Sequence, residues 1–68
     1  MNGKQFIKQA KAWAKANGHE FSIDASRGKG GHQIIRVGDR KTTVKTSEIG
    51  VGLLHAMLGQ LNIPKGEF

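Results

Sequence analysis

Residues 32–45, HQIIRVGDRKTTVK, read as two short strands joined by a tight turn. The flanking stretches 32–37 and 41–45 are rich in β-branched residues, which favour strands. Gly38-Asp39 lies between them and is typical of a hairpin turn, because such turns need backbone angles that glycine adopts readily. We therefore predict an antiparallel hairpin whose first strand has two distinct faces, with Gln33, Ile35 and Val37 on one and His32, Ile34 and Arg36 on the other.

A third strand is predicted upstream of the hairpin, separated from it by a glycine-rich loop. In the stretch EFSIDAS, residues 20–26, apolar residues alternate with polar ones, which is the pattern of a half-buried strand. Strands that follow one another in sequence tend to pair as neighbours. The apolar set is Phe21, Ile23 and Ala25, and Val44 and Thr42 extend the same core face on the last strand.

A helix is predicted on each side of these strands. Asn2 and Gln5 have the spacing of a capping box, and the first helix should end near Asn17-Gly18 with a left-handed cap. The second helix is expected to be capped near Ser47 and stopped by Pro64. The expected apolar faces are Phe6, Ile7, Ala10, Trp13 and Ala14 on the first helix, and Leu53, Leu54, Met57, Leu58 and Leu61 on the second.

The order of these elements predicts the fold class. It is α+β, in the order α-β-β-β-α, with a three-stranded antiparallel sheet and both helices on one face. We expect residues 1–68 to form a single domain, which is short enough that its core is near the lower size limit for independent stability. This arrangement resembles the double-stranded-RNA-binding fold.

Composition indicates the kind of partner. Eleven Lys and Arg residues stand against five Asp and Glu residues, for a net charge of +6. Such an excess favours a polyanionic partner: nucleic acid first, then a membrane surface or an acidic protein. The chain has no cysteine, and its three histidines and scattered acidic residues show no metal-ligand spacing, so we expect neither a metal nor a cofactor. With no signal peptide or membrane span in the pattern, a cytoplasmic location is expected.

Part of the positive charge is arranged along the first helix. Lys4, Lys8, Lys11 and Lys15 recur at spacings of four, three and four, and therefore form one stripe along the helix. A solvated outer face accounts for such a stripe. Contact with phosphates, or with an acidic protein partner, accounts for it as well, and the sequence leaves these alternatives open.

The loop before the hairpin carries the residues that suggest chemistry. Glycines allow backbone N–H groups to approach an anion, and adjacent cations add charge at the same place. A histidine fixed at the start of a strand is suited to take a proton from a ribose 2′-OH, which then attacks the neighbouring phosphorus. A plain connecting loop remains the alternative. The candidate catalytic residue is His32, and the candidate RNA-binding residues are Arg27, Gly28, Lys29, Gly30, Gly31 and Arg36.

Two segments resemble the HicA family of bacterial toxins. Gly31-His32 is similar to the tripeptide that opens the second strand in that family, and EIGVGLLHAMLGQLNI, residues 48–63, is similar to its closing helix. The resemblance implies a small mRNA interferase that cleaves RNA without a metal. It also implies that His32 is catalytic and that a HicB-like antitoxin covers it.

The chain departs from that family at two places. Gly31 stands where a serine is usual, and Lys45-Thr46-Ser47 follows the last strand where many members have Pro-x-His. A non-catalytic RNA-binding module is the alternative function. Residues 47–63 contain no lysine or arginine, however, which argues against duplex binding through the second helix.

Overall fold

The chain folds around the predicted hairpin. In the computed structural model, residues 1–24 and 32–68 are described, and their element order is α-β-β-β-α followed by a short 3-10 turn. This confirms the predicted α+β class. The elements are α1 (Gly3–Ala16), β1 (Phe21–Asp24), β2 (His32–Val37), β3 (Arg40–Lys45), α2 (Val51–Leu61) and η1 (Lys65–Glu67).

The three strands form an antiparallel sheet in the order β1-β2-β3, with β2 in the centre. Val37 pairs with Arg40 across a two-residue turn, in which Gly38 has a φ of 62°. A positive φ at the first central position is strongly disfavoured for a residue with a side chain, so glycine is required there. The hairpin prediction is confirmed.

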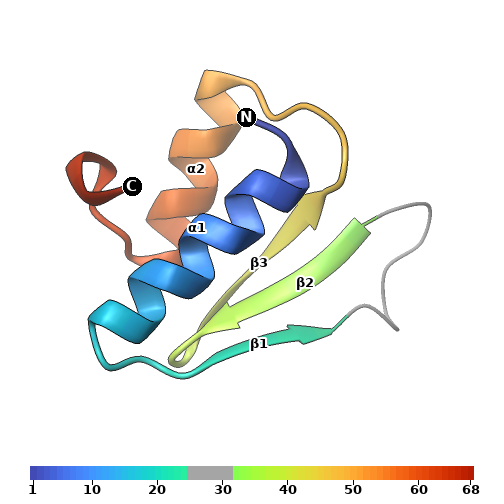
Figure 1. Ribbon diagram of the computed structural model, residues 1–68. Helices are drawn as coiled ribbons and strands as arrows, with labels where there is room; N and C mark the ends of the chain where they lie inside the picture. The colour runs from blue at the N-terminus through green and yellow to red at the C-terminus, as the bar shows by residue number, and fades with distance from the viewer. Residues whose placement is uncertain (25–31) are drawn as a thin grey trace.

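Both helices cover the same face of the sheet (Figure 1). The core lies between them and the strands, and it takes alternate residues from β2 and β3, as the two-residue period of a strand requires. Ile23 belongs to this face by its pairing with Ile35, but 47% of its surface is exposed. The buried apolar residues are Phe6, Ala10, Ala14, Ile35, Val37, Val44, Ile49, Met57, Leu58, Leu61 and Ile63.

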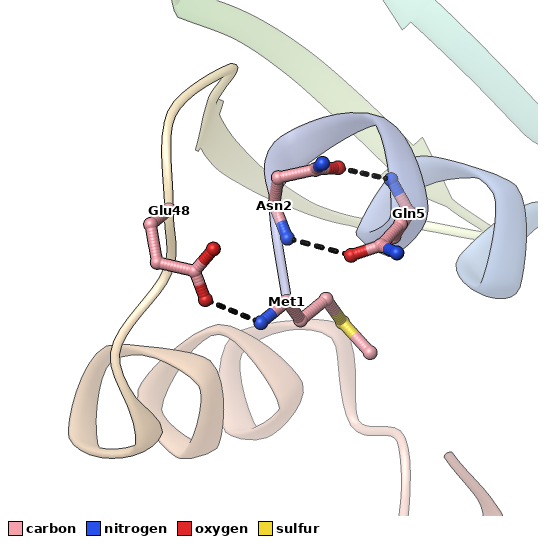
Figure 2. Close-up of polar contacts among 4 residues, drawn as sticks. All are labelled: Met1, Asn2, Gln5 and Glu48. Carbon is pink, nitrogen blue, oxygen red and sulfur yellow. Dashed lines mark hydrogen bonds and ion pairs between the residues drawn. The ribbon is translucent and has the colours of Figure 1, made fainter.

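The predicted boundaries of α1 are confirmed. The Asn2 side chain accepts from the Gln5 N–H at 2.9 Å, and the Gln5 side chain accepts from the Asn2 N–H at 3.0 Å, which completes a capping box (Figure 2). At the other end Gly18 has a φ of 73°, and the His19 N–H donates to the Ala14 carbonyl at 2.8 Å. These two features make a left-handed cap.

The predicted start of α2 is wrong. The helix begins at Val51 after Gly50, which provides no side-chain cap, rather than near Ser47. Residues 47–49 instead lie antiparallel to residues 1–3: the Gly3 N–H donates to the Ser47 carbonyl at 3.2 Å, and the Ile49 N–H donates to the Met1 carbonyl at 2.7 Å. The Met1 ammonium group also pairs with the Glu48 carboxylate at 2.5 Å (Figure 2). Pairing with a distant segment has overridden the local capping signal.

The end of α2 is set two residues before Pro64. Asn62 adopts a left-handed conformation with a φ of 60°, and the Ile63 N–H donates to the Leu58 carbonyl at 2.9 Å. Asparagine tolerates this conformation better than most residues do. The helix has therefore already ended when the chain reaches Pro64, which was the predicted stop.

The apolar side of α2 is narrower than predicted. Met57, Leu58 and Leu61 are buried and Leu54 is half-buried, but 43% of Leu53 is exposed. The helix is held on β3 by a polar contact as well, because the buried Thr42 hydroxyl hydrogen-bonds the Gln60 side-chain oxygen. A Cβ atom added at Gly52 or at Gly59 would have no atom of the described residues within 4 Å. Close packing against another part of the chain therefore does not explain them.

The last residues return to α1. The Trp13 indole N–H donates to the Glu67 carboxylate at 2.9 Å, and the rings of Phe6 and Phe68 lie 5.0 Å apart. This contact covers part of the apolar side of α1, which lies opposite the lysines on the helix.

Candidate nucleic-acid interface

The sheet face opposite the helices, which we call the open face, is where the candidate site lies. No helix of the described chain packs on it (Figure 1). Its members follow from the strand register, because residues directly opposite one another share a face. They are Ser22 and Asp24 of β1, His32, Ile34 and Arg36 of β2, and Lys41, Thr43 and Lys45 of β3.

His32 is the first residue of β2 and is half-buried. Its place on the open face is fixed because Gln33 and Ile35, the alternate residues of the strand, belong to the helix-covered side. The imidazole is therefore presented by the central strand of the sheet rather than by a loop. This is the placement that the sequence predicted.

Lys45 is directly opposite His32 across the β2–β3 ladder. Side chains in such a pair have Cβ atoms about 4.5 to 5.5 Å apart, so an ammonium group and an imidazole share one end of the open face. Lys45 is exposed. Lys45 is not among the predicted site residues, because only the pairing register shows which residue of β3 lies opposite His32.

A second cationic row lies further along the same face. Arg36 pairs with Lys41 on one side and with Ser22 on the other. These residues, together with Asp24 and Ile34, line a shallow pocket of about 410 Å³. Arg36 was predicted to contact RNA and the structure places it on the open face, whereas Lys41 was not singled out.

The charge of the open face is predominantly positive. Three fixed cations, Arg36, Lys41 and Lys45, belong to it, and Asp24 is the single acidic residue of its described part. No ion pair neutralises those three cations within the described ranges 1–24 and 32–68. The face is thus suited to a polyanion.

His32 and Lys45 also border a pocket of about 330 Å³ at the outer edge of β3. Its opposite wall is the exposed side of α2, formed by Leu53, Ala56, Met57 and Gln60. An apolar wall next to an imidazole and an ammonium group is suited to a ligand with both a flat apolar part and a negative charge.

The glycine-rich loop cannot be compared with its prediction. Arg27, Gly28, Lys29, Gly30 and Gly31 lie outside the described residues, and so does Ala25, the last apolar residue predicted for the first strand. Of the predicted RNA-binding set, Arg36 is the member that the structure describes.

The other two histidines are not close to this face. From the sequence, His55 lies beside the apolar stripe of the second helix, which predicts partial burial, but the structure shows it exposed on α2. The helix begins later than expected and turns a narrower side to the core. His19 is exposed just beyond α1, where its ring stacks on Trp13 at a centroid distance of 5.3 Å.

The lysine stripe of α1 is solvent-exposed at all four positions, which are Lys4, Lys8, Lys11 and Lys15. It belongs to the helical side of the molecule, away from the open face. None of these lysines has an acidic partner within the described residues. The stripe and the open face are therefore two separate positive surfaces.

Metal-ligand clusters and membrane-spanning helices are both absent from the part of the chain that the structure describes. Across residues 1–24 and 32–68, no group of three or more histidine, cysteine, aspartate or glutamate side chains is placed to hold a metal ion. Over the same residues, neither helix has the length and apolar character needed to cross a membrane.

Comparisons with known proteins identify no relatives: no family model, no curated protein and no solved structure matches this chain.

Proposed function

We propose that this protein is a metal-independent endoribonuclease, the toxin of a type II toxin–antitoxin system related to HicA. The observation that carries the proposal is the position of His32, on the uncovered face of the sheet and directly opposite Lys45. The resemblance of residues 31–32 and 48–63 to HicA supports it. The α-β-β-β-α order supports, in the same way, a fold of the double-stranded-RNA-binding type.

In the proposed reaction His32 acts as a general base. Its imidazole takes the proton of a ribose 2′-OH, the 2′-oxygen forms a bond to the adjacent phosphorus, and the bond from phosphorus to the 5′-oxygen breaks. The 5′-oxygen leaves with a proton from the imidazolium, passed directly or relayed through a water molecule, and this transfer returns His32 to its neutral form. The products are a 2′,3′-cyclic phosphate and a 5′-hydroxyl end.

Lys45 would act on the phosphate rather than on the proton. The phosphorane that forms during attack carries more negative charge than the starting diester, so a cation next to it stabilises the transition state more than the ground state. Lys45 is placed for this by strand pairing with His32. Arg27 and Lys29 of the preceding loop are further candidates for the same role.

The proposed antitoxin is a HicB-like protein that covers the open face. A partner seated there blocks His32 and the cations of the second row together. An acidic surface on the partner would complement Arg36, Lys41 and Lys45. An mRNA substrate also implies that the protein acts in the cytoplasm.

The direct test replaces His32. We expect His32→Ala to abolish cleavage of single-stranded RNA in excess EDTA, and to abolish growth arrest when the gene is expressed, while the circular dichroism spectrum is unchanged. His55→Ala is the matched control, because this exposed histidine lies on α2 away from the open face. Undiminished cleavage by His32→Ala, or equal loss in both variants, would contradict the assignment.

The second candidate is a non-catalytic RNA-binding module, and one observation favours it. Cation-mediated binding to the open face needs no proton transfer, and His32 is the one histidine of that face within the described residues. This candidate predicts RNA affinity that falls with increasing salt and no turnover by the parent protein.

A further inference from the structure

The second cationic row of the open face lines a pocket and is therefore a candidate subsite. Ser22, Arg36 and Lys41 stand side by side across all three strands. With Ile34 and Asp24 they line the pocket of about 410 Å³ described above. The half-buried Ile34 is paired with Asp24 in one row of this lining, and the cations Arg36 and Lys41 are paired at the other end.

The cationic end of this pocket is unfavourable for the free protein. Like charges directly opposite one another on neighbouring strands destabilise a sheet, and Arg36 is directly opposite Lys41. Neither side chain has an acidic partner among the described residues. An anionic ligand between the two cations would remove the repulsion.

We propose that this pocket binds one nucleotide of a single-stranded RNA at a distance from the bond that is cleaved, and that Arg36 and Lys41 hold its phosphate. The inference rests on the proposed ribonuclease function for the identity of the substrate. It adds that recognition extends along β2, away from His32.

The spacing of the strand sets the reach of the site. Arg36 is four residues from His32, which is about 13 Å along an extended strand. At the stacked spacing of about 3.4 Å per nucleotide this distance covers roughly four nucleotides, and it covers fewer in an extended strand. The phosphate at Arg36 and Lys41 therefore lies roughly two to four positions from the scissile phosphate.

The chemistry of the lining residues orients the nucleotide. A guanidinium group binds phosphate oxygens in a bidentate manner, and an ammonium group beside it adds a point charge. Ile34, two residues from Arg36 on the same face of β2, offers an apolar surface for the ribose or base.

The linear arrangement of residues along β2 favours binding of single-stranded RNA over a duplex. His32, Ile34 and Arg36 follow one line along the central strand, so one nucleic-acid backbone can follow them. Proteins that bind single-stranded nucleic acids commonly hold the backbone in a charged groove of this linear kind. The expected substrates are single-stranded RNAs that extend several nucleotides to one side of the cleaved bond.

The test compares substrates of different length. The variant is Arg36→Gln with Lys41→Gln, and the control is Lys8→Gln with Lys11→Gln, which removes the same charge from exposed positions of α1. Each protein is given a ten-nucleotide RNA and a dinucleotide that contains only the scissile phosphate. We expect the ratio of kcat/KM for the long substrate to that for the dinucleotide to fall at least about tenfold in the variant, and to stay within about twofold in the control.

An unchanged ratio in the variant would overturn the subsite, because the pair would then act equally on both substrates or on neither. If the parent protein does not cleave RNA, the proposed function fails, and the subsite is judged by binding instead. In a His32→Ala background, fluorescence anisotropy measures affinity for the ten-nucleotide RNA. A loss of at least about tenfold with Arg36→Gln and Lys41→Gln, but not with the α1 control, supports the subsite, and equal affinities overturn it.

Discussion

His32 and Lys45 become neighbours through hydrogen bonding between strands, although they are thirteen positions apart in the chain. A cationic residue on a paired strand is already held in position, whereas a cationic residue on a loop must first become ordered before it can stabilise a developing charge. The pairing of His32 with Lys45 therefore depends on the register of β2 and β3. A slip of one residue would place His32 on the helix-covered face.

Gly3 shows how tightly the start of α1 is packed on the end of β3. A Cβ atom at this position would lie 1.8 Å from the Lys45 carbonyl oxygen. The contact is with backbone, which cannot move aside as a flexible side chain can. Glycine at this position is therefore a steric requirement for the contact between α1 and the strand that carries Lys45.

We predict that Gly3→Ala lowers the free energy of unfolding by about 2 kcal/mol or more, because overpacking at a backbone contact forces α1 away from β3. Gly59→Ala is the matched control. Its Cβ meets no described atom within 4 Å, and alanine is favoured over glycine in a helix by up to about 1 kcal/mol. Urea unfolding followed by circular dichroism measures both. Equal stability of the two variants would show that α1 does not sit against Lys45 as described.

At the scale of elements, the N-terminal residues join parts of the fold that are distant in sequence. Residues 1–3 lie beside residues 47–49, so the entry to α1 and the connection from β3 to α2 form one unit. The capping box of Asn2 and Gln5 lies inside this unit. The start of α1 is thus stabilised by a local signal and by a long-range one.

We predict that Asn2→Ala lowers stability by about 1 kcal/mol, because the Gln5 N–H loses its acceptor. Asn2→Asp should retain the parent stability or exceed it. It keeps the acceptor oxygen and adds a negative charge at a helix N-terminus whose first turn has no acidic residue. Thermal unfolding of the three proteins at one salt concentration makes the comparison. A loss of stability in Asn2→Asp as large as that in Asn2→Ala would contradict the capping role.

The elements differ in how far local sequence determines them. Asn2, Gln5 and Gly18 act through neighbours a few residues away, so both ends of α1 are predictable. Gly38 fixes the hairpin in the same local way. The start of α2 was not predictable, because Ser47 is engaged by the N-terminal residues rather than by the helix that follows it.

The residues of the candidate site also differ in whether the sequence alone can place them. Strand alternation alone places His32 and Arg36 on one face of β2, and the structure agrees. Lys41 and Lys45 depend on which residues of β3 pair with them, and this follows from the hairpin register rather than from any motif. The sequence also does not show that Leu53 stays exposed, since that depends on how α2 is rotated against β3.

At the scale of the whole molecule, charge is distributed over two surfaces with different surroundings. The open face combines cations with His32 and with two pockets, whereas the α1 stripe carries lysines alone. Of these two surfaces, only the open face has a group capable of proton transfer, His32, next to a cation, Lys45. This difference is the reason for placing RNA cleavage on the open face and treating the stripe as a solvated surface.

The most direct measurement of this claim uses one RNA and a matched copy that carries a single 2′-deoxy nucleotide at the cleaved position, both in excess EDTA. We predict that the parent protein cuts the first and leaves a 2′,3′-cyclic phosphate, detected by mass spectrometry, and that the second stays intact at that position. Cleavage of the deoxy-substituted copy at the same bond, or activity that disappears with EDTA, would contradict 2′-OH attack assisted by His32.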